Sequence, residues 1–248
     1  MPKLLLPVVL SMAMLALLVV APGRAEPTSG STSGSTSGSA PGYGSSLGLG
    51  NNAGRPPPDL AALVPQVDIG GLPMLGSAAA PVTIVEFIDY ECPYCQGYAR
   101  DTWPKIRANY IDTGKVRYVA RDFPLARHGR ARPAAIAAAC AGEQGRFWEM
   151  HEALFAGAGQ LREQDIEAHA RQLGLDAGKF AACRADVRHQ ARLDADVAAA
   201  RQAGASGTPS FLVGASAGNV ARGRLLQGGE DYASFEKVLA RYLGTAAP

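Results

Sequence analysis

The sequence VTIVEFIDYECPYC, residues 82–95, joins a strand-like segment to two closely spaced cysteines. Its first eight residues are apolar on both alternating faces, as in a strand buried in the middle of a sheet. Two cysteines, Cys92 and Cys95, follow with Pro93 between them, and proline suits the first turn of a helix. This helix is predicted to run past Pro104, with a kink there, to a cap at Gly114. The centre of the domain is therefore a buried strand that leads into a helix carrying two cysteines.

Outward from this stretch, the pattern predicts an α/β domain with a helical insertion. Residues 116–123 are predicted to form the next strand, which gives a parallel strand-helix-strand unit. Residues 130–203 are alanine-rich and indicate several short helices. Strands are expected at 210–213 and 220–227, around a glycine-rich turn. A final helix is predicted from apolar residues at i, i+3, i+4 and i+7, namely Phe235, Val238, Leu239 and Tyr242. The expected fold class is α/β, with a mixed sheet flanked by helices.

The first 58 residues are predicted to export and tether this domain. Residues 1–25 contain Lys3, then an apolar run, and end on Gly23-Arg24-Ala25, the small-x-small pattern of a signal-peptidase site. An uncleaved membrane anchor is the alternative, because the apolar run is just long enough to span a bilayer. In residues 26–58, Gly, Ser, Pro and Thr supply 24 of 33 positions, which predicts a disordered linker. The folded domain is expected at 59–248.

The composition excludes some classes of protein. The chain has 248 residues, of which 47% are hydrophobic and 19% charged, enough to bury a core. Lys3 and Arg24 are the only charged side chains before Glu26, so removing residues 1–25 lowers the basic count from 24 to 22, equal to the acidic count of 22. Nucleic-acid binding requires clustered Lys and Arg, and no nucleic-acid partner is expected.

The cysteines carry the expected chemistry. An exported chain meets an oxidising compartment, where paired cysteines form disulfides. The helix start stabilises a thiolate on Cys92, which makes it a good leaving group and makes its disulfide with Cys95 oxidising. A structural disulfide and half a zinc site are the alternatives. Zinc is disfavoured because Cys140 and Cys183 are 43 residues apart, so neither a metal nor a cofactor is expected.

Glu86 is a candidate proton carrier for this cysteine pair. It precedes Cys92 by six residues and lies between Ile84 and Ile88 on its own face of the strand. Desolvation there should raise the pKa of its carboxyl group and let it exchange protons with Cys95. A glutamate at the strand edge, turned to solvent, is the alternative.

Five other positions receive simpler predictions. The Thr208-Pro209 bond leads into a predicted strand and is a candidate cis peptide. Asp89 and Glu91 are expected to be solvated loop charges. His151, among aromatic residues on one side of a helix, is expected in the core, and His189 at the surface.

Together, VEFIDYECPYC (85–95), the helical insertion and GTPSFLVG (207–214) resemble the DsbA family of thioredoxin-fold thiol:disulfide oxidoreductases, in the branch with threonine before the cis-proline. The resemblance covers residues 72–243. It implies that Cys92 is the exposed nucleophile, Cys95 its buried partner, Glu86 the buried acid, and Thr208-Pro209 the loop facing the disulfide.

The candidate substrate-binding residues are Pro93, Tyr94, Thr208 and Pro209. The prototype has histidine where this chain has Tyr94, which gives the thiolate less electrostatic support. Cys140 and Cys183 most simply bond to each other as a structural disulfide, worth about 4 kcal/mol in the chain-entropy description. A second redox pair that passes electrons to Cys92 is the alternative.

The sequence therefore predicts an exported protein dithiol oxidase of the periplasm or cell envelope. A substrate thiolate attacks Cys92, and a second substrate thiol resolves the mixed disulfide. Reduced secreted proteins are the expected partners, and the resemblance implies a membrane partner that passes electrons to quinone. A reductase or isomerase on the same fold and a non-catalytic secreted thioredoxin-like binding module are the alternatives.

Overall fold

The computed structural model describes residues 64–157 and 159–244. The predictions for a signal or anchor at 1–25 and for a linker at 26–58 lie outside these residues, as does the expected start of the domain at residue 59. Within the two described ranges, no helix combines the length and apolar character that crossing a bilayer requires.

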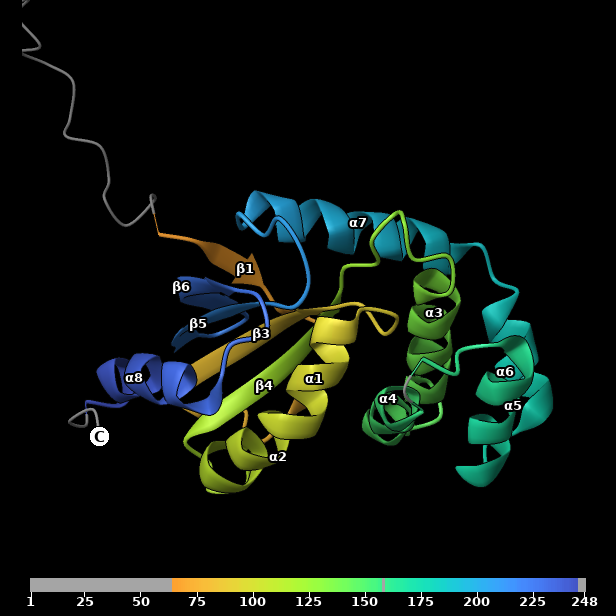
Figure 1. Ribbon diagram of the computed structural model, residues 1–248, viewed down its shortest axis with the longest axis horizontal. Helices are drawn as coiled ribbons and strands as arrows, with labels where there is room; N and C mark the ends of the chain where they lie inside the picture. Colours follow the sequence, from red (N-terminus) through yellow and green to blue (C-terminus); the bar gives the residue numbers. More distant parts are fainter. Residues whose placement is uncertain (1–63, 158, 245–248) are drawn as a thin grey trace, which may run out of the picture. The chain divides into compact units, whose positions relative to one another are not determined.

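A six-stranded mixed sheet lies at the centre of the domain, in the order β1-β6-β5-β3-β4-β2 (Figure 1). Every residue of β3 is buried, as its two apolar faces predict. β3 pairs in parallel with β4 and antiparallel with β5, which places it centrally. The strands are β1 (Gln66–Asp68), β2 (Met74–Leu75), β3 (Val82–Ile88), β4 (Val116–Asp122), β5 (Ser210–Ala217) and β6 (Val220–Gln227).

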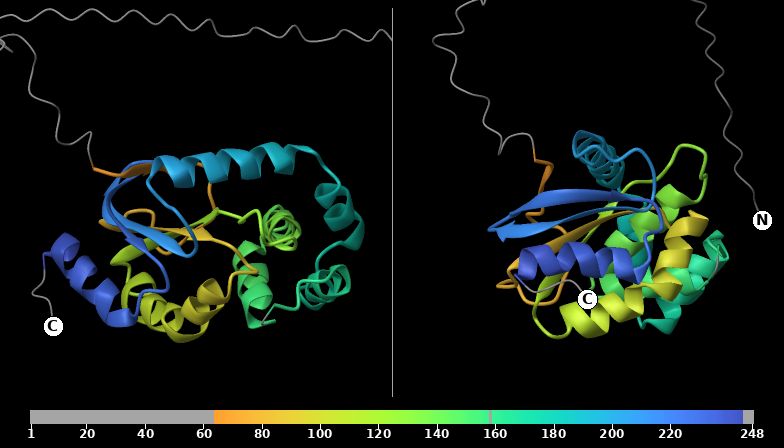
Figure 2. Two further views of the ribbon diagram at one scale, coloured as in Figure 1. Left: turned by 45° about the horizontal axis from the view of Figure 1, so that its top comes forward. Right: turned by 60° about the vertical axis from the view of Figure 1, so that its left-hand side comes forward.

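Helices cover both faces of the sheet. Apolar residues of α1, α2 and α8 pack on one face, and the carboxyl-terminal end of α7 packs on the other (Figures 1 and 2). The helices are α1 (Pro93–Asp101), α2 (Trp103–Ile106), α3 (Ala131–Gly142), α4 (Phe147–Ala156), α5 (Glu163–Gln172), α6 (Ala177–Arg184), α7 (Arg188–Gln202) and α8 (Tyr232–Leu243). The predicted α/β class, with a helical insertion between β4 and β5, is confirmed.

The helix after the cysteines differs from its prediction. It is broken at Thr102, before Pro104, and ends in a π-helical turn, Arg107–Ile111. Pro104 lies in the first turn of α2, where its missing N–H breaks no helical hydrogen bond. In a continuous helix, its ring would clash with the carbonyl four residues earlier. The predicted kink at Pro104 is therefore a break just before it. The short edge strands β1 and β2 were not predicted.

The insertion has a core of its own that reaches the cysteines. Alanines of α3 pack against α4, α5 and α6, and this buried cluster also contains Ile88, Tyr90, Cys92 and Cys95. The carboxyl end of β3 and the start of α1 therefore lie at the junction between the sheet and the helical insertion.

Candidate active site

Cys92 lies at the amino-terminal end of α1. The turn after β3 is closed by the Cys92 backbone N–H, which donates to the Asp89 carbonyl at 3.1 Å. Pro93 occupies the first helical turn. When it is protonated, the Cys92 thiol donates a hydrogen bond to the Thr208 carbonyl, with a sulfur-to-oxygen distance of 3.2 Å. The helix start thus holds the first sulfur against the loop that precedes β5.

The pKa of Cys92 is lowered from 9.0 to about 5. The largest cause is a hydrogen bond with the Cys95 side chain, and the Thr208 side chain and two backbone N–H groups add to it, against desolvation. The buried Thr208 hydroxyl has no hydrogen-bond partner among the described residues, so it is free to turn toward the thiolate. Cys92 is therefore ionised at neutral pH although Tyr94 supplies no charge.

Cys95 has the opposite character. Burial is the largest cause of a pKa raised well above 9.0, and the hydrogen bond with Cys92 and the charge of Glu86 act in the same direction. At neutral pH, Cys92 carries a negative charge and Cys95 keeps its proton.

Glu86 lies on β3 and is only 1% exposed. The Tyr118 hydroxyl donates to its Oε2 at 2.8 Å, and Tyr98 and Tyr118 share a hydrogen bond of 3.0 Å. Burial raises the pKa of the Glu86 carboxyl from 4.5 to about 8, against the effect of the Tyr118 hydrogen bond. Its Oε1 has no partner within the described part of the chain. Glu86 can therefore hold a proton at neutral pH near the Cys95 thiol, whose pKa is also raised.

The exposure of the site corrects the sequence prediction. Cys92, expected to be exposed, is 0% exposed, and both residues of the Thr208-Pro209 loop are buried. The Thr208-Pro209 bond is cis. The Thr208 carbonyl lies 3.2 Å from the Cys92 sulfur, and the Gly228 N–H holds the loop by donating to the Pro209 carbonyl at 2.8 Å. Within the Cys-Pro-Tyr-Cys motif, the exposed side chains are those of Pro93 and Tyr94, the latter 68% exposed.

Asp89 is a site residue that the sequence reasoning missed. Expected to be solvated, it is buried and accepts hydrogen bonds from the backbone N–H groups of Glu91 and Leu125, both at 2.8 Å. Its Oδ2 also lies 2.7 Å from His128 Nδ1. Asp89 thus joins the turn before Cys92 to the loop after β4. The only signal for it was its place directly after a buried strand.

His151 packs in the core, as predicted. Its Nδ1 forms a hydrogen bond of 3.1 Å with the Tyr90 hydroxyl, and burial lowers its pKa from 6.5 to about 3. The ring is therefore neutral and supports the turn that carries Tyr90 rather than supplying a charge.

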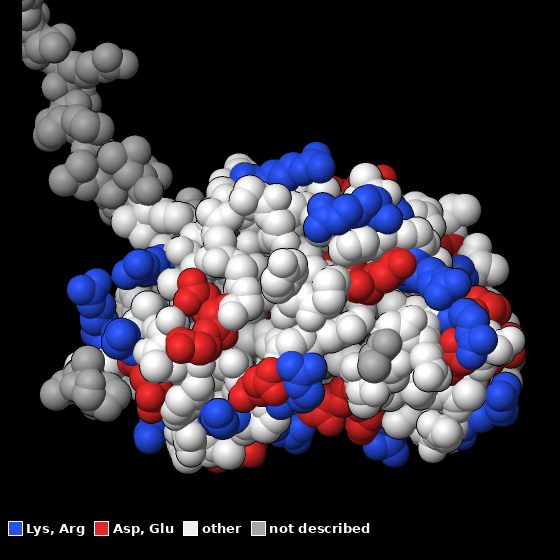
Figure 3. All heavy atoms as spheres, viewed as in Figure 1, with Lys and Arg blue, Asp and Glu red and all other residues white. Residues whose placement is uncertain are grey.

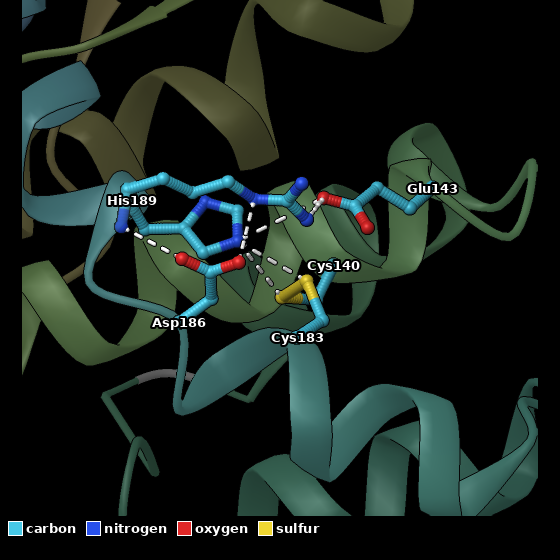
Figure 4. A network of polar contacts seen from close by, with 6 residues as sticks. Cys140, Glu143, Cys183, Asp186 and His189 are labelled. Atoms are coloured by element: carbon cyan, nitrogen blue, oxygen red, sulfur yellow. Dashed lines mark hydrogen bonds and ion pairs between the residues drawn. A yellow bond between two sulfur atoms is a disulfide. The ribbon is translucent and has the colours of Figure 1, made fainter.

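Cys140 on α3 and Cys183 on α6 are joined by a disulfide, with their Cα atoms 5.8 Å apart (Figure 4). His189, predicted at the surface, is instead only 3% exposed, because it packs on this disulfide at the start of α7. Burial is the largest cause that lowers the pKa of its imidazole, followed by the charges of Arg192 and Arg188. Cys92 and Cys95 are free thiols.

Comparison with known families gives the identity of the fold. Residues 70–221 match the thioredoxin family. The chain belongs to the thioredoxin family. Among solved structures, it is similar to alpha-DsbA1 of Wolbachia pipientis, with a TM-score of 0.64 at 23% identity over 74% of this chain and 96% of that chain. It is also similar to oxidised BdbD of Bacillus subtilis, with a TM-score of 0.59 at 25% identity over 73% of this chain and 97% of that one. This thioredoxin-family chain therefore has the DsbA-type fold that its motifs predict.

The sequence alignments with curated relatives cover less than half of each relative's length. Disulfide bond formation protein D of Bacillus subtilis is 41% identical over 93 residues, which are 36% of this chain and 41% of that protein. A Na(+)/H(+) antiporter, NhaA 3 of Salinispora tropica, is 46% identical over 139 residues, 56% of this chain and 21% of the antiporter. This thioredoxin-family chain therefore spans about a fifth of the antiporter and less than half of the disulfide bond formation protein.

Proposed function

We propose that this chain is an exported thiol:disulfide oxidoreductase that oxidises dithiols in secreted proteins. The observation that carries the proposal is the difference between two thiols of one motif, a Cys92 with a pKa of about 5 beside a Cys95 with a raised pKa. Stabilising the Cys92 thiolate stabilises the reduced pair, which makes the Cys92–Cys95 disulfide a strong oxidant.

The exchange proceeds in two displacements. A substrate thiolate attacks the Cys92 sulfur of the Cys92–Cys95 disulfide, a mixed disulfide forms, and Cys95 leaves with the electron pair. A second substrate thiolate then attacks the substrate sulfur of the mixed disulfide, and Cys92 leaves as a stable thiolate. The substrate has lost two electrons and two protons. The enzyme keeps both electrons as the Cys92 thiolate and the Cys95 thiol, one proton ends on Cys95, and the other goes to solvent. Two sulfurs suffice for this exchange, so the proposal includes neither a cofactor nor a metal.

Glu86 supplies the proton that Cys95 needs. Its carboxyl group is protonated below its pKa of about 8, so at neutral pH it can give a proton to the departing Cys95 sulfur. The raised pKa of Cys95 makes it a strong base when it leaves, and transfer from Glu86 is then favourable. Glu86 recovers a proton from the substrate thiols that are oxidised.

The surface around the site suits an unfolded polypeptide. On the face shown in Figure 3, charged side chains of both signs surround an uncharged middle, where α1 begins in the matching ribbon view (Figure 1). Pro93 and Tyr94, in the first turn of α1, are exposed, and the Thr208-Pro209 loop would become accessible beside them once it moves away from Cys92. A cavity of about 490 Å³ beside α1, lined by Ala99, Trp103 and Phe155 among others, offers space for apolar substrate side chains.

The cellular setting of the proposal follows from the sequence. An N-terminal signal or anchor at 1–25 and a linker at 26–58 would place the domain outside the cytoplasm, in the periplasm or cell envelope. There, a membrane partner that passes electrons to quinone would restore the Cys92–Cys95 disulfide.

Two cysteine variants test the proposal. Cys92→Ser should abolish disulfide transfer in a refolding assay with a reduced secreted protein, because the attacked sulfur is gone. Cys95→Ser, supplied with a substrate disulfide, should accumulate a mixed disulfide through Cys92, because Cys95 is the enzyme's only resolving thiol in this mechanism. Mass mapping identifies the bond. Full activity of Cys92→Ser would refute the proposal.

A further inference from the structure

His189 lies against a disulfide that could pack without it. Cys140, Cys183 and His189 come from α3, α6 and α7, and their sulfur and ring-nitrogen atoms all lie within 4.8 Å of one another (Figure 4). His189 Nε2 is 3.1 Å from Cys183 Sγ and 3.6 Å from Cys140 Sγ. The fold therefore brings three potential metal-ligand atoms together, although Cys140 and Cys183 are 43 residues apart in sequence.

The chemistry of these three groups fits a metal better than it fits a disulfide alone. A disulfide sulfur is a weak hydrogen-bond acceptor, and the other ring nitrogen of His189 is buried with no partner among the described residues. Burying an imidazole without full hydrogen bonding costs free energy, whereas burying an apolar side chain at the same position would not. Two cysteines and one histidine are, by contrast, a ligand set that zinc uses in proteins.

We propose that Cys140, Cys183 and His189 form a redox-gated metal site, closed while the disulfide is intact and able to bind Zn²⁺ once it is reduced. A dithiol reductant supplies two electrons and two protons and is itself oxidised to a disulfide, and the Cys140–Cys183 bond becomes two thiols. Zn²⁺ then binds both sulfurs and His189, and two protons are released.

The geometry permits this change with little movement of the backbone. Two thiolates at about 2.3 Å from a tetrahedral zinc lie about 3.8 Å apart. With Cα atoms 5.8 Å apart, side-chain rotation of Cys140 and Cys183 can open that distance. Glu143, at the end of α3, has Oε1 3.8 Å from His189 Nε2 and can supply a fourth ligand if it leaves Arg188, to which it is bonded at 2.6 Å. Water can fill the position otherwise.

The site has a route to solvent. A cavity of about 380 Å³ opens on the disulfide and is lined by both cysteines together with Glu143, Lys179, Asp186 and Arg188. A reductant and a hydrated cation can enter here, past the carboxylates of Glu143 and Asp186. Cys92 and Cys95 do not line this cavity, so metal binding here is independent of the proposed dithiol oxidation.

Zinc binding by the reduced protein tests the proposal. The full chain carrying Cys92→Ser and Cys95→Ser retains Cys140 and Cys183 as its only cysteines. It is reduced with a phosphine, freed of reductant by anaerobic gel filtration, and titrated with Zn²⁺ against a chromophoric chelator. The reduced protein should bind one equivalent of Zn²⁺ and the oxidised protein none. Co²⁺ in place of Zn²⁺ should give thiolate-to-metal absorption.

The histidine is tested in the same reduced background. His189→Gln should weaken Zn²⁺ binding at least about tenfold, whereas the control His169→Gln, on α5, should leave it unchanged. Zn²⁺ should also raise the melting temperature of the reduced parent more than that of reduced His189→Gln. Equal affinity of the reduced parent and His189→Gln would overturn the proposal. So would equal binding by oxidised protein, no binding by reduced protein, or loss of the circular dichroism spectrum on reduction, because each rules out a folded, redox-gated site.

Discussion

Glu86 makes the stability of the folded protein depend on pH. Because burial raises its pKa from 4.5 to about 8, the unfolded chain loses this proton at lower pH than the folded chain. The contribution of Glu86 to the free energy of unfolding therefore falls as pH rises through this window, by up to about 1.4 kcal/mol per pH unit. Glu86→Gln, which keeps an acceptor for Tyr118, should remove that slope and be at least as stable as the parent at neutral pH. Denaturant midpoints across the window measure both.

In the oxidised protein, the Cys92–Cys95 disulfide does not titrate, and the upper part of this window belongs to Glu86. In the reduced protein, the Cys92 thiol, with a pKa lowered from 9.0 to about 5, gives a slope of the opposite sign there, so the measurement uses oxidised protein. Asp122, with a pKa raised from 3.8 to about 6, gives a slope of the same sign at lower pH, and His151, lowered from 6.5 to about 3, gives the opposite sign there. Between about 6.5 and 8, the slope should therefore disappear in Glu86→Gln and persist in the control Glu167→Gln, an exposed glutamate of α5. Thiol:disulfide exchange, followed by stopped flow, should also be slower in Glu86→Gln. If this variant kept the parent's exchange rate and the parent's dependence of unfolding free energy on pH, Glu86 would have no role in proton transfer.

At the scale of elements, Asp89 ties the turn after β3 to the loop after β4. Asn has a single side-chain oxygen, so it loses either the acceptor of the Glu91 N–H or the acceptor that the Leu125 N–H and His128 share, and it places an N–H₂ group there. Asp89→Asn should lower the free energy of unfolding by about 1–3 kcal/mol, as measured by denaturant titration. Asp101→Asn, at an exposed position of α1, is the control and should leave stability unchanged. Parent-like stability of Asp89→Asn would show that this link is dispensable.

The Cys140–Cys183 disulfide joins α3 to α6 and should resist mild reduction. A buried structural disulfide has a lower potential than one with an activated thiolate, so limited dithiothreitol should open Cys92–Cys95 first. Alkylation and mass mapping should then find label on Cys92 and Cys95 alone, with a fully reduced, denatured sample as the control for all four. Label on Cys140 at the same potential as on Cys92 would favour the two-pair relay instead.

The elements that could be predicted are those whose signal is local. β3 follows from its own apolar faces, and α8 follows from the helical spacing of its apolar residues, of which Phe235, Val238 and Leu239 are buried. The burial of Asp89 could not be predicted, because its partners Leu125 and His128 are 36 and 39 residues away in sequence. The burial of His189 could not be predicted either, because it depends on a disulfide whose cysteines are 6 and 49 residues away. Short edge strands such as β1 carry too few residues to show a period.

At the scale of the whole molecule, the site lies where two cores meet. The cluster that contains Cys92 and Cys95 is the core of the helical insertion, whereas Glu86 reaches them from the central strand of the sheet. The sequence could predict both parts but not how closely the Thr208-Pro209 loop would cover Cys92, since that depends on packing between them. In the proposed exchange, the Thr208-Pro209 loop must therefore move away from Cys92 before a substrate thiolate can reach its sulfur. An exposed sulfur would not need this movement.

The reduction potential of the Cys92–Cys95 pair decides whether this disulfide oxidises dithiols. Equilibration of the full chain with glutathione buffers, followed by alkylation and mass spectrometry, gives this value. Because the Cys92 thiolate is stabilised to a pKa of about 5, we expect a potential near about −120 mV, that of a strong oxidant. A potential near about −270 mV, typical of a reductase, would contradict it.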